Sequence, residues 1–189
     1  MDRVQRIEYW HWSAGEIFST DDIKQLHSVT KNNLNKDIKD LPASGVVKSS
    51  KVDFVSYKSL RPHLNNLEQR IRWCNNEHFG FILHPFTDFD TVHLNTYNST
   101  NSGEYGWHSD VADGDKPWDI KFTILINVSQ NFYTGGDFQF MLNGEKDVPE
   151  LNDCGSVVMF RSHLQHRVKP MVQGERQTLT LFVIGPKFQ

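Results

Sequence analysis

The chain has 189 residues, of which 38% are hydrophobic and 23% charged, and its formal net charge at pH 7 is -3. This length suits one domain with a substantial core, so we expect a single domain over residues 1–189. The slightly acidic balance disfavours a nucleic-acid groove as the main binding surface, because phosphate backbones bind clustered Lys and Arg.

Targeting and redox signals point to a cytoplasmic protein. The first residues are polar, which disfavours a secretory signal, and the longest apolar run, 179–184, has the length of a strand and not of a membrane span. The chain has two cysteines, Cys74 and Cys154. We expect a reduced pair, although their positions leave a disulfide open.

The first part of the chain predicts two helices and two strands. Alternation over 7–12 favours a strand. Ser19 followed three residues later by Asp22 resembles a capping box, and predicts a helix over about 20–33. A polar loop over 32–50 and an alternating strand over 51–58 follow. A second helix is predicted by apolar residues at helical spacing, which indicates core packing: Leu60, Leu64, Leu67, Ile71 and Cys74.

From residue 79 onward the pattern changes to short strands separated by Gly, Asn, Asp and Pro. Many short strands at such spacing indicate a sandwich or barrel. We therefore expect a mostly β fold, with helical support over about 1–78 and a barrel core over about 79–185. The predicted strands cover 79–83, 92–97, 105–110, 120–128, 138–142, 156–160, 167–171 and 177–184.

The strand over 105–110 carries a candidate metal site. Alternate side chains of a strand share a face, so His108 and Asp110 project together. The segment 162–168 offers a second imidazole, from either His163 or His166. Two histidines and one carboxylate, with coordination positions left open, are the ligand set of non-haem Fe(II) oxygenases.

Three motifs together resemble the Fe(II)/2-oxoglutarate-dependent dioxygenases, in the prolyl-4-hydroxylase-like branch that includes the bacterial PKHD-type hydroxylases. They are Gly106-Trp107-His108-Ser109-Asp110, Thr134-Gly135-Gly136-Asp137-Phe138 and the run from His166-Arg167-Val168-Lys169-Pro170 to Arg176. Their order and spacing match over roughly residues 90–185. The resemblance implies a double-stranded β-helix, a jelly-roll or cupin-like barrel, backed by the two N-terminal helices.

The resemblance also implies roles for individual residues. His166 is the third ligand, because it directly precedes Arg-Val-x-Pro and lies ten residues before a basic anchor; His163 is left as an exposed turn histidine or a substrate-pocket residue. Arg176 is that anchor, for the C5 carboxylate of 2-oxoglutarate. The matching cosubstrate positions are Tyr97 and Thr123, with Thr178 as an alternative. The implied cofactors are Fe(II), 2-oxoglutarate and O2, with ascorbate as an optional reductant.

The function implied is hydroxylation of an unactivated C–H bond, with 2-oxoglutarate decarboxylated to succinate. A prolyl residue in a peptide or protein is the first expected substrate, and a free amino acid or small metabolite is the alternative. A non-catalytic metal- or ligand-binding barrel, or a β-sandwich interaction protein, is the competing class. The sequence leaves the oligomeric state open and indicates neither a nucleic-acid nor a membrane partner.

Overall fold

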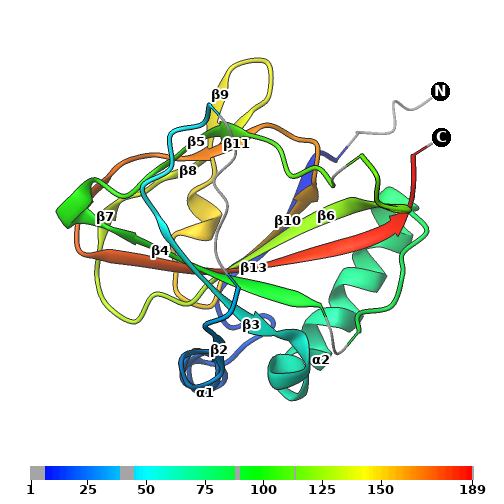
Figure 1. Ribbon diagram of the computed structural model, residues 1–189, viewed down its shortest axis with the longest axis horizontal. Coiled ribbons are helices and arrows are strands. Elements are labelled where there is room, and N and C mark those ends of the chain that lie inside the picture. Colours follow the sequence, from blue (N-terminus) through cyan, green and yellow to red (C-terminus); the bar gives the residue numbers. More distant parts are fainter. Residues whose placement is uncertain (1–6, 39–44, 88–89, 113, 189) are drawn as a thin grey trace.

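The computed structural model describes residues 7–38, 45–87, 90–112 and 114–188 (Figure 1). The two helices are α1 (Thr20–Asn32) and α2 (Tyr57–Cys74). The strands are β1 (Tyr9–Trp12), β2 (Leu34–Asn35), β3 (Lys51–Ser56), β4 (Thr91–Asn98), β5 (Tyr105–His108), β6 (Trp118–Asn127), β7 (Thr134–Gly135), β8 (Phe138–Met141), β9 (Glu145–Asp147), β10 (Val157–Arg161), β11 (His166–Val168), β12 (Met171–Gln173) and β13 (Glu175–Pro186).

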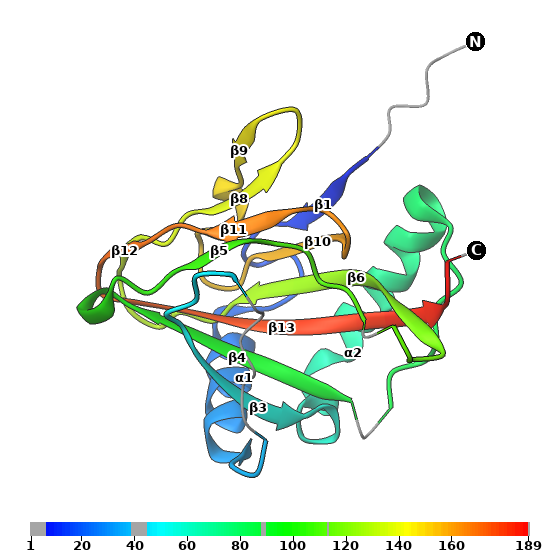
Figure 2. The same cartoon turned by 45° about the horizontal axis from the view of Figure 1, so that its top comes forward.

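The strands form two facing sheets and one short ribbon. The major sheet has the order β1-β10-β6-β13-β4-β3-β2, and the minor sheet has the order β5-β11-β8-β9. The ribbon pairs β12 with β7. Figure 2 shows the minor sheet above the major sheet and both helices beneath it. The expected double-stranded β-helix backed by two helices is confirmed, and the first third of the chain also contributes β1, β2 and β3 to the major sheet.

Both helices form where the sequence predicts them. The Ser19 side chain accepts from the backbone N–H of Asp22, and the Asp22 carboxylate accepts from the backbone N–H of Ser19, which completes the capping box at the start of α1. The apolar stripe predicted for α2 is fully buried. Helix α2 therefore covers the major sheet with one continuous apolar face.

The major sheet separates two cores because strand residues alternate between its faces. On β6, Ile124 and Ile126 pack toward the helices, whereas Leu125 faces the minor sheet. Strand β10 repeats this alternation, with Met159 on the helix side and Phe160 on the side of the minor sheet. The helix-side core is mainly apolar, with a part-buried polar contact between His27 of α1 and Gln177 of β13.

One predicted strand, over 79–83, is wrong. Helix α2 instead continues into a π-helical turn over Asn75–Phe79, which ends at Gly80 in the left-handed region. The side-chain amide of the buried Asn75 donates to the Phe81 carbonyl and accepts from the Phe81 backbone N–H, at 2.9 Å in both cases. A side chain thus satisfies the backbone groups that a neighbouring strand would have taken. The apolar run 79–83 resembles a strand in sequence, but the hydrogen-bond partner of Phe81 is the nearby Asn75 side chain.

Smaller differences concern element ends. The predicted strand over 51–58 stops at Ser56, since α2 begins at Tyr57, and the one predicted over 167–171 is divided into β11 and β12 around Pro170, which has no N–H to pair. The short strands β2 and β9 were not predicted. Cys74 is a buried free thiol and Cys154 an exposed one. In the described part of the chain, no helix is long and apolar enough to cross a membrane.

Replacing Asn75 by Ala should destabilise the fold, because the Phe81 N–H and carbonyl would lose their partners in a part-buried position. Each buried unsatisfied group costs about 1–3 kcal/mol, so we expect the free energy of unfolding to fall by about 2–4 kcal/mol in urea denaturation. Gln69→Ala, at an exposed position of α2, is the control and should change the stability by less than about 0.5 kcal/mol. Equal stability of both variants would contradict the role assigned to Asn75.

Candidate active site

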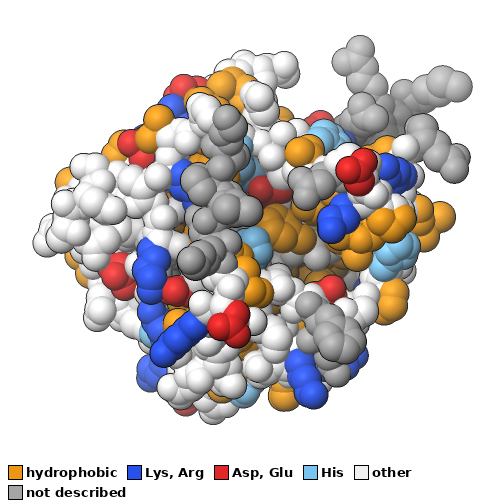
Figure 3. Space-filling model, viewed as in Figure 1, with side chains coloured by type: hydrophobic (Ala, Val, Ile, Leu, Met, Phe, Trp, Pro, Cys, Tyr) orange, Lys and Arg blue, Asp and Glu red, His pale blue; other side chains and the backbone are white. Residues whose placement is uncertain are grey.

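A cavity of about 190 Å³ lies between the two sheets. Its floor is the inward face of β4, β6 and β13, and its roof comes from β5, β8 and β11. Figure 3 shows this face of the molecule hollowed near its middle, with acidic and histidine side chains beside the hollow. The cavity is therefore placed where the inner faces of both sheets contribute side chains to one space.

His108, Asp110 and His166 converge at this cavity, with one ligand atom from each within 4.8 Å of the others. His108 and His166 are direct cross-strand partners on β5 and β11. The sequence predicts Asp110 on the same strand as His108, and this is wrong. Strand β5 ends at His108, and Asp110 lies in the loop that follows. Its backbone N–H donates to the Ser162 carbonyl at 2.9 Å, which fixes the loop beside the turn that precedes β11.

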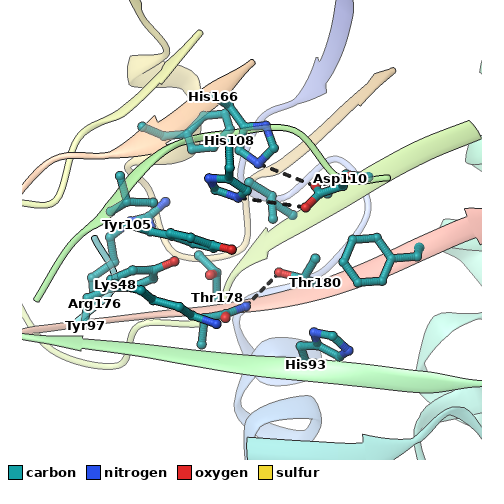
Figure 4. A pocket seen from close by; sticks show the side chains of 16 residues that line it. Lys48, His93, Tyr97, Tyr105, His108, Asp110, His166, Arg176, Thr178 and Thr180 are labelled. Carbon is teal, nitrogen blue, oxygen red and sulfur yellow. Dashed lines mark hydrogen bonds and ion pairs between the residues drawn. The ribbon is translucent and has the colours of Figure 1, made fainter. Parts of the chain in front are cut away.

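Backbone carbonyls fix the tautomers of both histidines. His108 Nδ1 lies 2.8 Å from the Gly106 carbonyl oxygen, and His166 Nδ1 lies 2.9 Å from the Leu164 carbonyl oxygen. A carbonyl only accepts, so each Nδ1 carries the proton and each Nε2 presents a lone pair. The Nε2 atoms of His108 and His166 lie 3.8 and 3.4 Å from oxygens of the Asp110 carboxylate (Figure 4).

The electrostatics of this cluster favour a bound cation. Burial lowers the pKa of His108 and of His166 to about 4, so both imidazoles are neutral at pH 7. Burial also raises the pKa of Asp110, while His108 and the Thr123 hydroxyl oppose that shift. Two imidazole lone pairs and a carboxylate thus face one another without a donor between them. A divalent cation satisfies all three at once, and two histidines with one carboxylate suit non-haem Fe(II).

Arg176 provides the opposite charge in the same cavity. The side chain is only 1% exposed, and its Nε and Nη2 atoms have no hydrogen-bond partner among the described residues. A buried guanidinium without an anion is costly, so the position calls for an anionic ligand. Gly136, in the second sequence motif, makes room for it: this residue has a φ of +66°, and a Cβ there would lie 3.2 Å from Arg176 Cδ and closer still to Met171.

The other predicted cosubstrate residues line the cavity too. Tyr97 is buried beside Arg176, with the guanidinium carbon 5.7 Å from its ring centre, and burial raises the pKa of its hydroxyl, which stays a donor. Thr178 lies one inward position farther along β13 (Figure 4). Thr123 also faces the cavity, but its hydroxyl donates to Asp110 Oδ2 at 2.6 Å. Thr123 therefore orients the carboxylate.

Sequence reasoning missed further cavity residues. His93 and Thr180 lie at the end of the cavity away from Arg176 (Figure 4), and they follow from the period-2 alternation of β4 and β13. Lys48 carried no such signal, because it lies in the polar loop before β3; an isolated bridge to Tyr105 brings it alongside β5. His163 does not line this cavity but a neighbouring hollow that also borders Asp110.

Comparisons with known sequences agree with this geometry. Residues 92–184 match the family model of the 2OG-Fe(II) oxygenase superfamily, and this segment holds the cluster of His108, Asp110 and His166 together with Arg176. A PKHD-type hydroxylase of Prochlorococcus marinus is 36% identical over 90 residues, which is 45% of this chain. The matched stretch covers 38% of that relative's length.

Solved structures share the fold over almost the whole chain. A prolyl-4-hydroxylase of Pseudomonas putida matches with a TM-score of 0.69 and 18% identity, covering 96% of this chain and 94% of its own. A prolyl hydroxylase of Trichoplax adhaerens, in complex with a hypoxia inducible factor peptide fragment, matches with a TM-score of 0.66 and 14% identity, covering 93% and 83%. The chain thus matches the 2OG-Fe(II) oxygenase superfamily over residues 92–184 and shares its overall fold with prolyl hydroxylases.

Proposed function

We propose that this protein is an Fe(II)- and 2-oxoglutarate-dependent oxygenase that hydroxylates a prolyl residue in a peptide or protein. The observation that carries the proposal is one cavity with two complementary ends. At one end, three electron-pair donors converge from His108, Asp110 and His166. At the other end, the buried Arg176 guanidinium has two nitrogens without a partner. A divalent metal and a dicarboxylate together satisfy both ends.

The overall reaction balances with one cosubstrate molecule per hydroxyl group. 2-Oxoglutarate, O2 and a C–H bond give succinate, CO2 and a C–OH group. Bound Fe(II) supplies the redox chemistry, which side chains cannot. The protein contributes ligands of fixed tautomer, through the carbonyls of Gly106 and Leu164, and a carboxylate oriented by Thr123. These supporting hydrogen bonds hold the ligands in place before the metal binds.

The anionic cosubstrate is held by the Arg176 end of the cavity. A guanidinium presents a planar fork of donors that matches a carboxylate, and burial strengthens such a pair. The Tyr97 hydroxyl is a second donor beside it, while Leu125, Phe138 and Val168 supply apolar wall. These walls keep water from the reacting groups, which matters because a reactive oxidant formed without substrate damages the protein around it.

Binding of metal and cosubstrate should be visible in one anaerobic titration with Fe(II) and 2-oxoglutarate, followed by the metal-to-ligand charge-transfer band. We expect the band in the wild type and none in His108→Ala. Arg176→Ala should need about 10- to 100-fold more 2-oxoglutarate, since hydrogen bonds to charged groups contribute about 1.5–3 kcal/mol. Arg70→Ala, an exposed arginine of α2, should behave as the wild type. A normal band in His108→Ala would contradict the proposed metal site.

The same titration distinguishes a role of Thr123 in metal binding from a role in cosubstrate binding. Thr123→Val keeps the shape but removes the hydrogen bond to Asp110, so Fe(II) affinity should fall about 10- to 100-fold, as for other partners of metal ligands. Affinity for 2-oxoglutarate at saturating Fe(II) should not change. Thr178→Val is the matched control and should leave Fe(II) affinity intact. The reverse pattern for Thr123→Val would assign its hydroxyl to the cosubstrate instead.

The substrate class is tested by succinate release. Proline-containing peptides should stimulate succinate formation from 2-oxoglutarate well above the rate without substrate, whereas free L-proline should not. Mass spectrometry of the peptide should show the addition of one oxygen atom per succinate. Stimulation by free amino acids, with peptides inactive, would favour the small-metabolite alternative. Metal and cosubstrate binding without turnover of either would favour a binding barrel.

A further inference from the structure

A trough runs along the surface beside the candidate metal centre. Two hollows, of about 290 and 440 Å³, share His163 and Phe188 as common walls. The first borders Asp110, and the second ends at Arg161 and Glu8. We call the two neighbouring hollows and their shared walls the trough. It lies outside the cavity that holds Arg176, so neither the metal nor the cosubstrate occupies it.

The end of the trough next to Asp110 is apolar. Val111 and Phe188 are 69% and 50% exposed there, and Ile120 contributes to the same wall. The Phe188 ring is fixed by the ammonium of Lys121, 3.3 Å from the ring centre, and by its own backbone N–H, which donates to the Asp119 carboxylate. Exposed apolar side chains held in place beside a reaction centre suit an apolar side chain of the substrate.

The far end of the trough is cationic. The Arg161 side chain is 16% exposed, and its Nε is buried without a hydrogen-bond partner among the described residues. Its ion pair, to Glu8, is long at 3.5 Å and half-exposed, and its flat face lies over the Phe79 ring. A guanidinium has five N–H donors, so the single long contact to Glu8 leaves donors of the terminal nitrogens for an incoming carboxylate.

The trough is joined to the metal ligands by the chain itself. Arg161 and Leu164 close a turn that carries His163 and leads directly into His166. The same turn accepts a hydrogen bond from Asp110 through the Ser162 carbonyl. A ligand lying along this turn is thus held at a fixed position relative to the candidate reaction centre.

We propose that the trough binds the polypeptide substrate beside its target residue, taking an apolar side chain near Asp110 and an acidic side chain at Arg161. This inference rests on the proposed function and narrows its substrate class to acidic peptides. Charge complementarity at Arg161 argues for it. Of the three carboxylates that line the trough, Asp110 belongs to the candidate metal centre, Asp119 accepts from the Phe188 backbone N–H, and Glu8 pairs with Arg161 only at 3.5 Å. A small metabolite in the cavity would not reach this surface.

The test uses fluorescein-labelled peptides with one central proline and one glutamate, glutamine or lysine placed in turn at each flanking position. Peptide binding is measured by anisotropy under anaerobic conditions with Fe(II) and 2-oxoglutarate, and succinate release is measured separately in air. For the wild type we expect glutamate to be favoured over lysine by about fivefold at one position, the scale of a partly exposed ion pair. Arg161→Glu should invert this order, and Arg161→Gln should abolish it.

Glu8→Gln is the matched control, because it removes the competing carboxylate and should strengthen the preference for glutamate. A purely structural Arg161–Glu8 pair predicts instead that these variants change stability and leave the order of peptides unchanged, and that result would overturn the proposal. Phe188→Ala should reduce the preference for leucine over alanine next to the proline. Selective peptide binding that depends on Arg161 but yields no succinate would support the trough and contradict the proposed activity. Succinate release without a charge preference would support the proposed activity and contradict the trough.

Discussion

The buried guanidinium of Arg176 carries a large desolvation cost, and the structure around the candidate site is built to accommodate it. Removing an unpaired charge from water costs several kcal/mol, and the described residues offer it no carboxylate. The fold tolerates this cost because Arg176 begins the central strand β13, which is paired on both sides by β4 and β6. The Gly136 turn closes over its stem. Stability comes from elsewhere, mainly from the apolar core between the helices and the major sheet.

The major sheet thus does two physically different things with its two faces. Its outer face is covered by α1 and α2 and contributes mainly apolar packing, together with a polar contact between Gln177 of β13 and His27 of α1. Its inner face carries Arg176, Tyr97 and Thr123 into a cavity. The alternation of strand side chains keeps the two faces apart, since every second residue of β6 and β13 belongs to the other face. The polar groups of the candidate site therefore lie in the space between the sheets.

The sequence predicted those features of the fold and of the candidate site that depend on residue periodicity and motif spacing. The apolar stripe of α2 and the Gly, Asn, Asp and Pro residues between the short strands after residue 79 are local signals, and helix α2 and strands β4, β6 and β13 were predicted from them. The clustering of His108, Asp110 and His166 was found through spacing that resembles a known family. Asp110 nevertheless lies beyond the end of β5, because its backbone pairs with a turn far along the chain, and no local pattern encodes such a contact.

Lys48, which sequence reasoning missed, has the same non-local character, because it reaches the cavity through one bridge to β5. The turn over residues 161–164 also makes a contact far along the chain. Its Ser162 carbonyl accepts from the Asp110 N–H, and the turn forms one wall of the trough. A ligand that displaces this turn would also displace the Ser162 carbonyl, to which the Asp110 N–H donates. Asp110, the proposed metal ligand, is therefore joined to one wall of the proposed trough by a hydrogen bond from its backbone N–H to the Ser162 carbonyl.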